Sequence, residues 1–237
     1  MLRKLISGDD LRKSRLHDEK GNFVGLGRLL LHAPAAVATG LLRLTVDYRP
    51  PLPWISYSAI NVLERFLTKS SRVLEFGSGM STIWYARRAG EVCSVEDYKP
   101  WFDKVSDLLN REHIDNVKYH LAATPSAYSE FMADDPSGFD LIMIDGSIRS
   151  SCISHAAKML RPGGIIYLDN SDKDSTSRGG DMRLAEKLVM QLASSRKATV
   201  TYFTDFAPTQ FFVQQGLMVK LRTDEDGLST AISGNNP

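Results

Sequence analysis

A glycine-containing turn is the first place where this sequence could do chemistry. The turn Gly77-Ser78-Gly79 follows the apolar segment 72–76 and precedes a helical pattern. Glycines in such a turn let the backbone approach a ligand closely, and the next helix presents free N–H groups to it. Glu96 ends the next apolar segment, nineteen residues after Gly77. A carboxylate there can accept hydrogen bonds from both ribose hydroxyls, so the pattern predicts an adenosine-containing ligand.

The residues around the turn indicate which class of adenosine-containing ligand it binds. A dinucleotide-binding turn has Gly or Ala at its sixth position, where this chain has Thr82. No Gly-Lys-Ser/Thr follows, which excludes a P-loop. Glu75, directly before the turn, disfavours a pyrophosphate but suits a ligand that carries an ammonium and a sulfonium. A nicotinamide-dependent oxidoreductase is therefore disfavoured.

Polar residues end two further apolar segments. Asp145 ends segment 139–145, and Asp169-Asn170 lie at the end of segment 165–169. In an open parallel sheet, ligands bind outside the carboxyl ends of the strands, so these side chains are expected to converge. Two carboxylates and an amide oxygen suit Mg²⁺ or another divalent cation. The alternative is that Asp145 and Asp169 cap helices or bind the adenosine ligand.

The elements that must position these residues alternate regularly from residue 54 onward. Apolar segments predict strands at 72–76, 91–96, 117–121, 139–145 and 165–169, with helical patterns between most of them. Continuous apolar strands that alternate with helices are typical of a doubly wound α/β fold, in which helices cover both faces of a parallel sheet.

The end of the chain departs from this alternation. Segments 198–203 and 212–221 are both strand-like, and only residues 205–211 lie between them. Parallel neighbours need a connection of a dozen or more residues, so this last pair is predicted to be antiparallel.

The sequence Glu75-Phe76-Gly77-Ser78-Gly79 together with Glu96 resembles the cofactor site of class I S-adenosylmethionine-dependent methyltransferases. The resemblance covers about residues 54–221. It implies a Rossmann-like methyltransferase fold, a mostly parallel seven-stranded sheet with an antiparallel last strand, and S-adenosylmethionine as the cofactor. It also implies a set of cofactor-binding residues: Glu75, Gly77, Ser78, Gly79, Ser81, Glu96 and Asp145. Ser81 stands where the family often has a third glycine.

Asp145, Asp169 and Asn170 resemble the metal site of the cation-dependent catechol-type O-methyltransferases. In those enzymes a divalent cation holds two vicinal oxygens and lowers the pKa of the attacking hydroxyl. The lysine that they carry three residues after the first aspartate is Ile148 here, and Arg149 follows it. Because an arginine stays protonated, it suits an anionic acceptor better than the role of a base. We therefore expect Asp145 and Arg149 at the catalytic position; the alternative for Arg149 is a surface ion pair.

These patterns predict an enzyme that methylates a small-molecule acceptor, with O-methylation expected. Two alternatives are a metal-free N- or carboxyl-methyltransferase on the same fold and a non-catalytic protein that binds S-adenosylmethionine. The formal net charge of +1 argues against a nucleic-acid partner. Cys93 and Cys152 fit neither a disulfide framework nor a zinc spacing, so we expect buried thiols and a cytoplasmic protein. The sequence does not specify an oligomeric state.

The 237 residues are expected to form one domain, 54–222, with an N-terminal extension, 1–53, and a flexible tail, 223–237. The first twenty residues are charged and mixed in sign, which predicts a loose tail. Segment 24–46 is rich in Leu, Ala and Val, but charged residues and a proline interrupt it. We expect it to pack on the domain as an amphipathic extension. The alternative is a membrane-surface anchor that uses Arg28 and Arg43.

Overall fold

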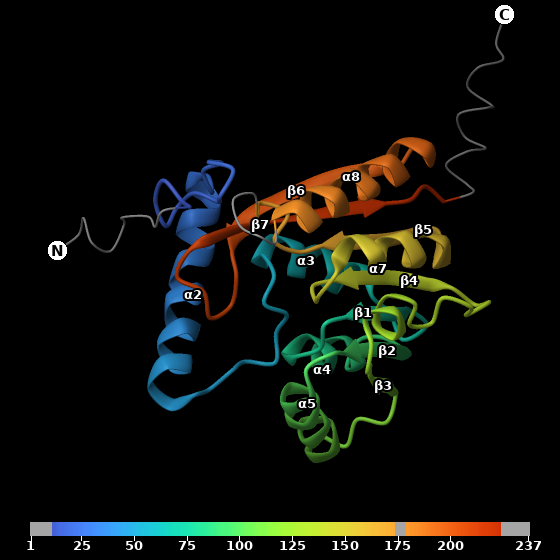
Figure 1. Ribbon diagram of the computed structural model, residues 1–237. Helices are drawn as coiled ribbons and strands as arrows, with labels where there is room; N and C mark the ends of the chain where they lie inside the picture. The colour runs from blue at the N-terminus through green and yellow to red at the C-terminus, as the bar shows by residue number, and fades with distance from the viewer. Residues whose placement is uncertain (1–10, 174–178, 224–237) are drawn as a thin grey trace, which may run out of the picture.

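A computed structural model describes residues 11–173 and 179–223, and the labels below are those of Figure 1. Seven strands form one sheet in the order β3-β2-β1-β4-β5-β7-β6. The strands are β1 (Arg72–Phe76), β2 (Glu91–Glu96), β3 (Val117–Leu121), β4 (Phe139–Ile144), β5 (Leu160–Leu168), β6 (Thr199–Phe206) and β7 (Val213–Lys220). All pairs are parallel except β5·β7 and β6·β7. The predicted fold, including its antiparallel last strand, is confirmed.

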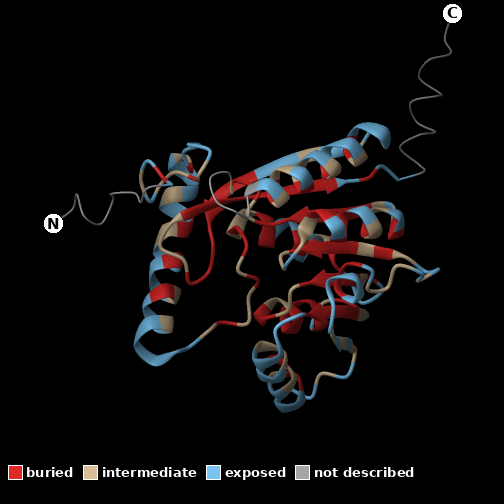
Figure 2. Ribbon diagram, in the orientation of Figure 1, coloured by how far each residue is buried: buried red, intermediate tan, exposed pale blue. Residues whose placement is uncertain are grey.

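Helices cover both faces of this sheet (Figure 1). The helices are α2 (Leu26–Val46), α3 (Tyr57–Phe66), α4 (Met80–Ala86), α5 (Lys99–Arg111), α6 (Pro125–Ser129), α7 (Arg149–Ala156) and α8 (Gly179–Ser195), with a 3₁₀ turn at Ala157–Met159. Apolar residues of α3 and α4 pack on one face, and those of α7 and α8 on the other. Strands β1, β2, β4 and β7 are almost wholly buried, whereas β3 and the first half of β6 are more exposed (Figure 2). This arrangement places the carboxyl ends of β1, β2, β4 and β5 along one edge.

Strand β5 begins earlier than the apolar pattern indicated. Leu160 pairs with Phe139, and the register then shifts so that Ile165 pairs with Leu141. The segment between them contains Pro162 and two glycines. A proline and glycines end the preceding helix, but at a bulge they are also compatible with a strand. The sequence analysis predicted a strand only over residues 165–169, so it missed the first part of β5.

The described part of the N-terminal segment is folded against the sheet. The buried Asp18 accepts hydrogen bonds from Asn22, from the Thr204 hydroxyl at 2.9 Å and from the Gln215 amide at 3.1 Å. Arg12 forms an ion pair with Glu19. The prediction of a loose tail over the first twenty residues is wrong for residues 11–20, because β6 and β7 hold Asp18 and because Arg12 pairs with Glu19. Residues 1–10 and 224–237, which include nearly all of the predicted flexible tail, lie outside the described residues.

Helix α2 lies beyond the carboxyl ends of β4 and β5, where the β6–β7 connection fixes it (Figure 1). His32 Nδ1 lies 2.7 Å from Asp205 Oδ2. A Cβ on Gly40 would come within 2.5 Å of the Phe211 ring, so the absence of a side chain allows the helix to pack closely there. Only His32, Ala36 and Gly40 of this helix are buried.

Candidate active site

The glycine turn connects β1 to α4 at the carboxyl edge of the sheet. Gly77 has φ 94°, and a Cβ there would lie 2.7 Å from the Gly146 Cα of the loop after β4. The turn and the loop after β4 are therefore in contact, and only glycine fits at position 77. Gly79 differs, because a Cβ there would find no atom closer than 3.8 Å. A side chain at position 79 would therefore fit, in ordinary van der Waals contact with Ser81 and Trp101.

Glu75 is buried under the turn and receives three hydrogen bonds. Its Oε1 accepts from Ser81 Oγ at 2.5 Å, and its Oε2 accepts from the Thr82 and Ser94 hydroxyls at 2.6 and 2.7 Å. Burial raises the pKa of Glu75 to about 7, although the three hydroxyls oppose the shift. Thr82 Oγ1 also accepts from Gly79 N. Glu75 therefore holds the turn in place through Thr82 and Ser81, while direct contact between Glu75 and a cationic ligand stays a prediction.

Glu96 lies directly beside the turn, as its position in the sequence predicted. Its Oε2 accepts from both the backbone N–H and the hydroxyl of Ser78, and its Oε1 accepts from the N–H groups of Asp97 and Tyr98. These bonds fix the carboxylate at the end of β2. Ribose contact through Glu96 stays a prediction, and it requires that ribose hydroxyls share this carboxylate with Ser78.

Two aromatic residues complete this part of the site. Trp101 Nε1 donates to the Ser78 carbonyl at 2.8 Å, and the Tyr119 hydroxyl lies 2.6 Å from Ser78 Oγ. Neither residue was singled out from the sequence. Ser94 was missed too, although the parallel register of β1 and β2 pairs it with Glu75.

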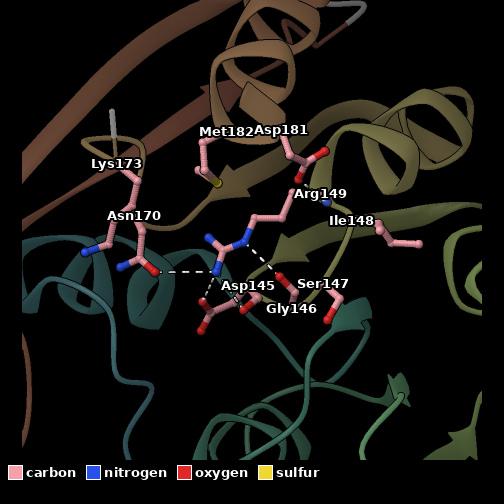
Figure 3. A pocket seen from close by; sticks show the side chains of 9 residues that line it. All are labelled: Asp145, Gly146, Ser147, Ile148, Arg149, Asn170, Lys173, Asp181 and Met182. Carbon is pink, nitrogen blue, oxygen red and sulfur yellow. Dashed lines mark hydrogen bonds and ion pairs between the residues drawn. The ribbon is translucent and has the colours of Figure 1, made fainter. Parts of the chain in front are cut away.

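Arg149 is the central side chain at the ends of β4 and β5 (Figure 3). Its Nη2 lies 3.1 Å from Asp145 Oδ1 and 3.4 Å from Asn170 Oδ1. The guanidinium also donates to the main-chain carbonyls of Gly146, Asp145 and Asp169. The spacing of four residues predicted that Arg149 would lie close to Asp145. It did not predict that the guanidinium would bind main-chain carbonyls of the protein itself.

The three predicted metal ligands therefore gather around an arginine. Asp145 and Asn170 turn oxygens to the guanidinium, and Asp169 contributes its carbonyl oxygen. Within the described residues, no group of three or more His, Cys, Asp or Glu side chains is arranged to hold a metal ion. As arranged, the trio does not offer an open cation site, because a permanent positive charge lies between its oxygens.

Asp169 is the most deeply buried acid of this group, at 2% exposed. Burial, and after it the neighbouring Asp145 carboxyl, holds the pKa of Asp169 well above its usual range. Its Oδ1 has no hydrogen-bond partner among the residues that the structure describes. Of the two neighbouring carboxyl groups, Asp169 is therefore expected to hold a proton, and Asp145, which faces Arg149, to carry the negative charge.

A cavity of about 560 Å³ opens beside Arg149. It is lined by the loop 145–149 and by Asn170, Lys173, Asp181 and Met182 (Figure 3). Asp181, at the start of α8, accepts from Arg149 N at 2.8 Å and from Ser150 Oγ at 2.5 Å. An acid from the next helix thus caps the start of α7, which fixes one wall of the cavity. Asp181 was not singled out from the sequence.

Comparison with known proteins agrees with this geometry. Residues 74–171, from β1 to the loop that follows β5, match the family described as a methyltransferase domain. Segment 74–171 is thus similar to a methyltransferase domain. A search of curated proteins found no match.

Three solved methyltransferases share the fold. One is a putative O-methyltransferase from Klebsiella pneumoniae (20% identity, TM-score 0.56, 94% of each chain covered). Another is the O-methyltransferase from Bacillus cereus in complex with SAH (17%, TM-score 0.57, 80% of this chain and 99% of that one). The third, from Streptomyces achromogenes, is involved in tomaymycin synthesis and was solved with SAM (18%, TM-score 0.57, 84% and 97%). At these identities the likeness shows the fold.

Proposed function

We propose that the protein transfers the methyl group of S-adenosylmethionine to an oxygen of a small-molecule acceptor. The observation that carries the proposal is the position of Glu96 beside the Gly77–Gly79 turn in a methyltransferase domain. Because Gly79 has no side chain, the methionine part of the cofactor can approach the backbone of the turn there. The O-methyltransferases that share the fold support oxygen as the acceptor atom.

The reaction needs little covalent chemistry from the protein. A lone pair of the acceptor oxygen attacks the sulfonium methyl carbon, the carbon–sulfur bond breaks, and S-adenosylhomocysteine leaves as a neutral sulfide. The proton of the acceptor hydroxyl is released to solvent. The chain contributes mainly by holding acceptor and cofactor in line. The cavity beside Arg149 adjoins the turn through the Gly77–Gly146 contact, so it is the proposed acceptor site.

A metal-free form of this reaction fits the site better than a cation-dependent one. Arg149 holds a fixed positive charge between Asp145 and Asn170. The proposed acceptor bears a carboxylate or a phosphate group that is drawn to this charge, and a different oxygen of the acceptor receives the methyl group. Most N–H groups of the Arg149 guanidinium already donate to main-chain carbonyls. An acceptor would therefore add a contact to the guanidinium or replace a weak one, such as the contact to Asn170.

The decisive experiment is an acceptor screen with methyl-labelled S-adenosylmethionine, run with magnesium and with a chelator. The proposal expects labelled product from an anionic acceptor, with unchanged rates under chelation. Loss of turnover under chelation would restore the cation-dependent mechanism at Asp145, Asp169 and Asn170. Methylation of a nitrogen, or of the carboxylate group itself, would select the N- or carboxyl-methyltransferase. Cofactor binding without product across the screen would favour the non-catalytic binder.

A further inference from the structure

Helix α2 exposes an apolar surface that no other described residue covers. Leu26, Leu30, Leu31 and Leu44 are 69–78% exposed, and further exposed positions on the helix are Val37, Leu41, Leu42 and Val46. Large exposed apolar surfaces are rare on soluble proteins unless something binds them. The helix has 21 residues, and its most apolar stretch has a mean hydropathy of 1.5.

The exposed apolar residues cover a wide arc of α2. At about 100° per residue, the positions from Leu26 through Leu41 to Leu42 cover nearly half of the circumference. His32, Ala36 and Gly40 face the opposite way, onto the β6–β7 connection. A helix that dimerises needs only a narrow apolar stripe, so this arc is wider than a partner helix would cover.

The exposed charges around this arc are mostly cationic. From residue 11 to residue 48, the exposed charged residues are Lys13, Arg15, Lys20, Arg28 and one acid, Asp47; Lys20 pairs with Glu186 and Asp47 with Arg49. The other two acids of the same stretch, Asp18 and Glu19, have side chains turned into hydrogen bonds or ion pairs with the protein. An anionic surface would therefore attract this part of the chain, whereas a second copy would repel it.

Aromatic residues flank α2 at both ends. Phe23, before the helix, and Tyr48, after it, are 44% and 51% exposed. In a helix that lies in the membrane interface, aromatic side chains beside the leucines add to the apolar area that the headgroup region buries.

We propose that α2 binds the surface of an anionic lipid bilayer and lies in the plane of the interface. The helix is long enough to span a bilayer, about 31 Å at 1.5 Å per residue. Spanning would break the contacts of His32 with Asp205 and of Arg28 with the Thr204 carbonyl. Lying flat keeps both contacts and buries the exposed leucines. Arg28 and Arg43 face the domain, toward Thr204 and Trp54, so the leucines and the cations of residues 13–20 supply the affinity.

The test is flotation of the purified full chain with vesicles of phosphatidylcholine, with and without phosphatidylglycerol. The wild type is expected to float with the anionic vesicles, and less so at high salt. The double variant Leu30→Gln/Leu41→Gln should lower the vesicle-bound fraction by at least about tenfold. Leu184→Gln is the matched control, because Leu184 is 48% exposed on α8 and lies outside the surface; it should float like the wild type.

A fluorophore reports the depth of the helix directly. Cys93 and Cys152 are buried, so Leu30→Cys and Leu184→Cys each offer one accessible thiol for an environment-sensitive dye. The dye at position 30 should shift to the blue with anionic vesicles, and the dye at position 184 should not.

Three results would overturn the proposal. The first is a wild type that stays with the soluble fraction, or a double variant that floats as well as the wild type. The second is a lipid-free dimer in light scattering that Leu30→Gln/Leu41→Gln dissociates, because α2 would then bind a second copy. The third is vesicle-bound protein that resists a high-pH carbonate wash, which would mean that α2 spans the bilayer. Thermal melts of each variant check that the fold is intact.

Discussion

Replacement of the buried Glu75 by glutamine should stabilise the cofactor-free protein at alkaline pH. Burial raises the pKa of Glu75 from 4.5 to about 7. An acid with a raised pKa binds its proton more tightly in the folded state than in the unfolded one. The free energy of unfolding therefore falls as the pH rises from about 4.5 to about 7, and stays at the lower value above that. Glutamine removes this pH dependence.

The magnitude follows from the shift. A difference of about 2.5 in pKa, at about 1.36 kcal/mol for each unit, gives a cost of about 3 kcal/mol at pH 8 for ionised Glu75. Glutamine can keep the Thr82 and Ser94 hydroxyls on its oxygen and donate its amide to Ser81 Oγ. Glu75→Gln should thus raise the melting temperature at pH 8 by roughly 6–12 °C and change it little at pH 5.

The assay is thermal unfolding of the wild type and the variant between pH 5 and pH 8.5 without ligand. Glu91→Gln is the control with the opposite sign, because the hydrogen bond from Lys118, together with Arg72, lowers the pKa of Glu91, and its loss should destabilise at pH 8. Calorimetry measures the effect on ligand binding. Glu75→Gln should bind S-adenosylmethionine more weakly than the wild type, and should lose less affinity for S-adenosylhomocysteine, which lacks the sulfonium charge. A variant less stable than the wild type at pH 8 would refute the reasoning.

Four further substitutions test the site. Gly79→Ala should leave the melting temperature unchanged, since no protein atom lies within 3.8 Å of the new Cβ, but should weaken cofactor binding at least about tenfold in calorimetry. Gly77→Ala should instead cost about 2 kcal/mol or more in denaturant unfolding, because its φ of 94° and the Gly146 backbone reject a Cβ. Arg149→Met should create a Mn²⁺ site, visible by electron paramagnetic resonance in the variant and not in the wild type; Mn²⁺ binding by the wild type would disprove the displacement of a cation by Arg149. Asp181→Ala should cost about 1 kcal/mol in denaturant unfolding through the lost cap of α7, and unchanged stability would show that the cap contributes nothing.

The sheet and the position of the turn could be predicted because they depend on local patterns. Strands β1 and β2 have the predicted bounds, and Glu96 meets Ser78 because both follow parallel neighbours. The antiparallel pair β6·β7 followed from the short connection alone. These features need no knowledge of side-chain conformation.

The remaining features depend on contacts that the local sequence does not specify. Arg149 has several rotatable bonds, so its spacing from Asp145 fixed the neighbourhood but not the backbone carbonyls that it binds. Asp18 looked like part of a charged tail because its partner Gln215 lies 197 residues away. Apolar residues surround most of α2, so its periodicity did not show which face would meet the domain.

Calorimetric titration of the wild type and Glu96→Gln with S-adenosylmethionine tests the central claim most directly. Glutamine keeps the size of the side chain but removes the charge that accepts from Ser78 and from the expected ribose hydroxyls. The wild type should bind S-adenosylmethionine and not a nicotinamide dinucleotide, and Glu96→Gln should lose roughly 1–3 kcal/mol of binding free energy. Equal affinity in the two proteins, or binding of the dinucleotide alone, would contradict the assignment of this turn to the cofactor.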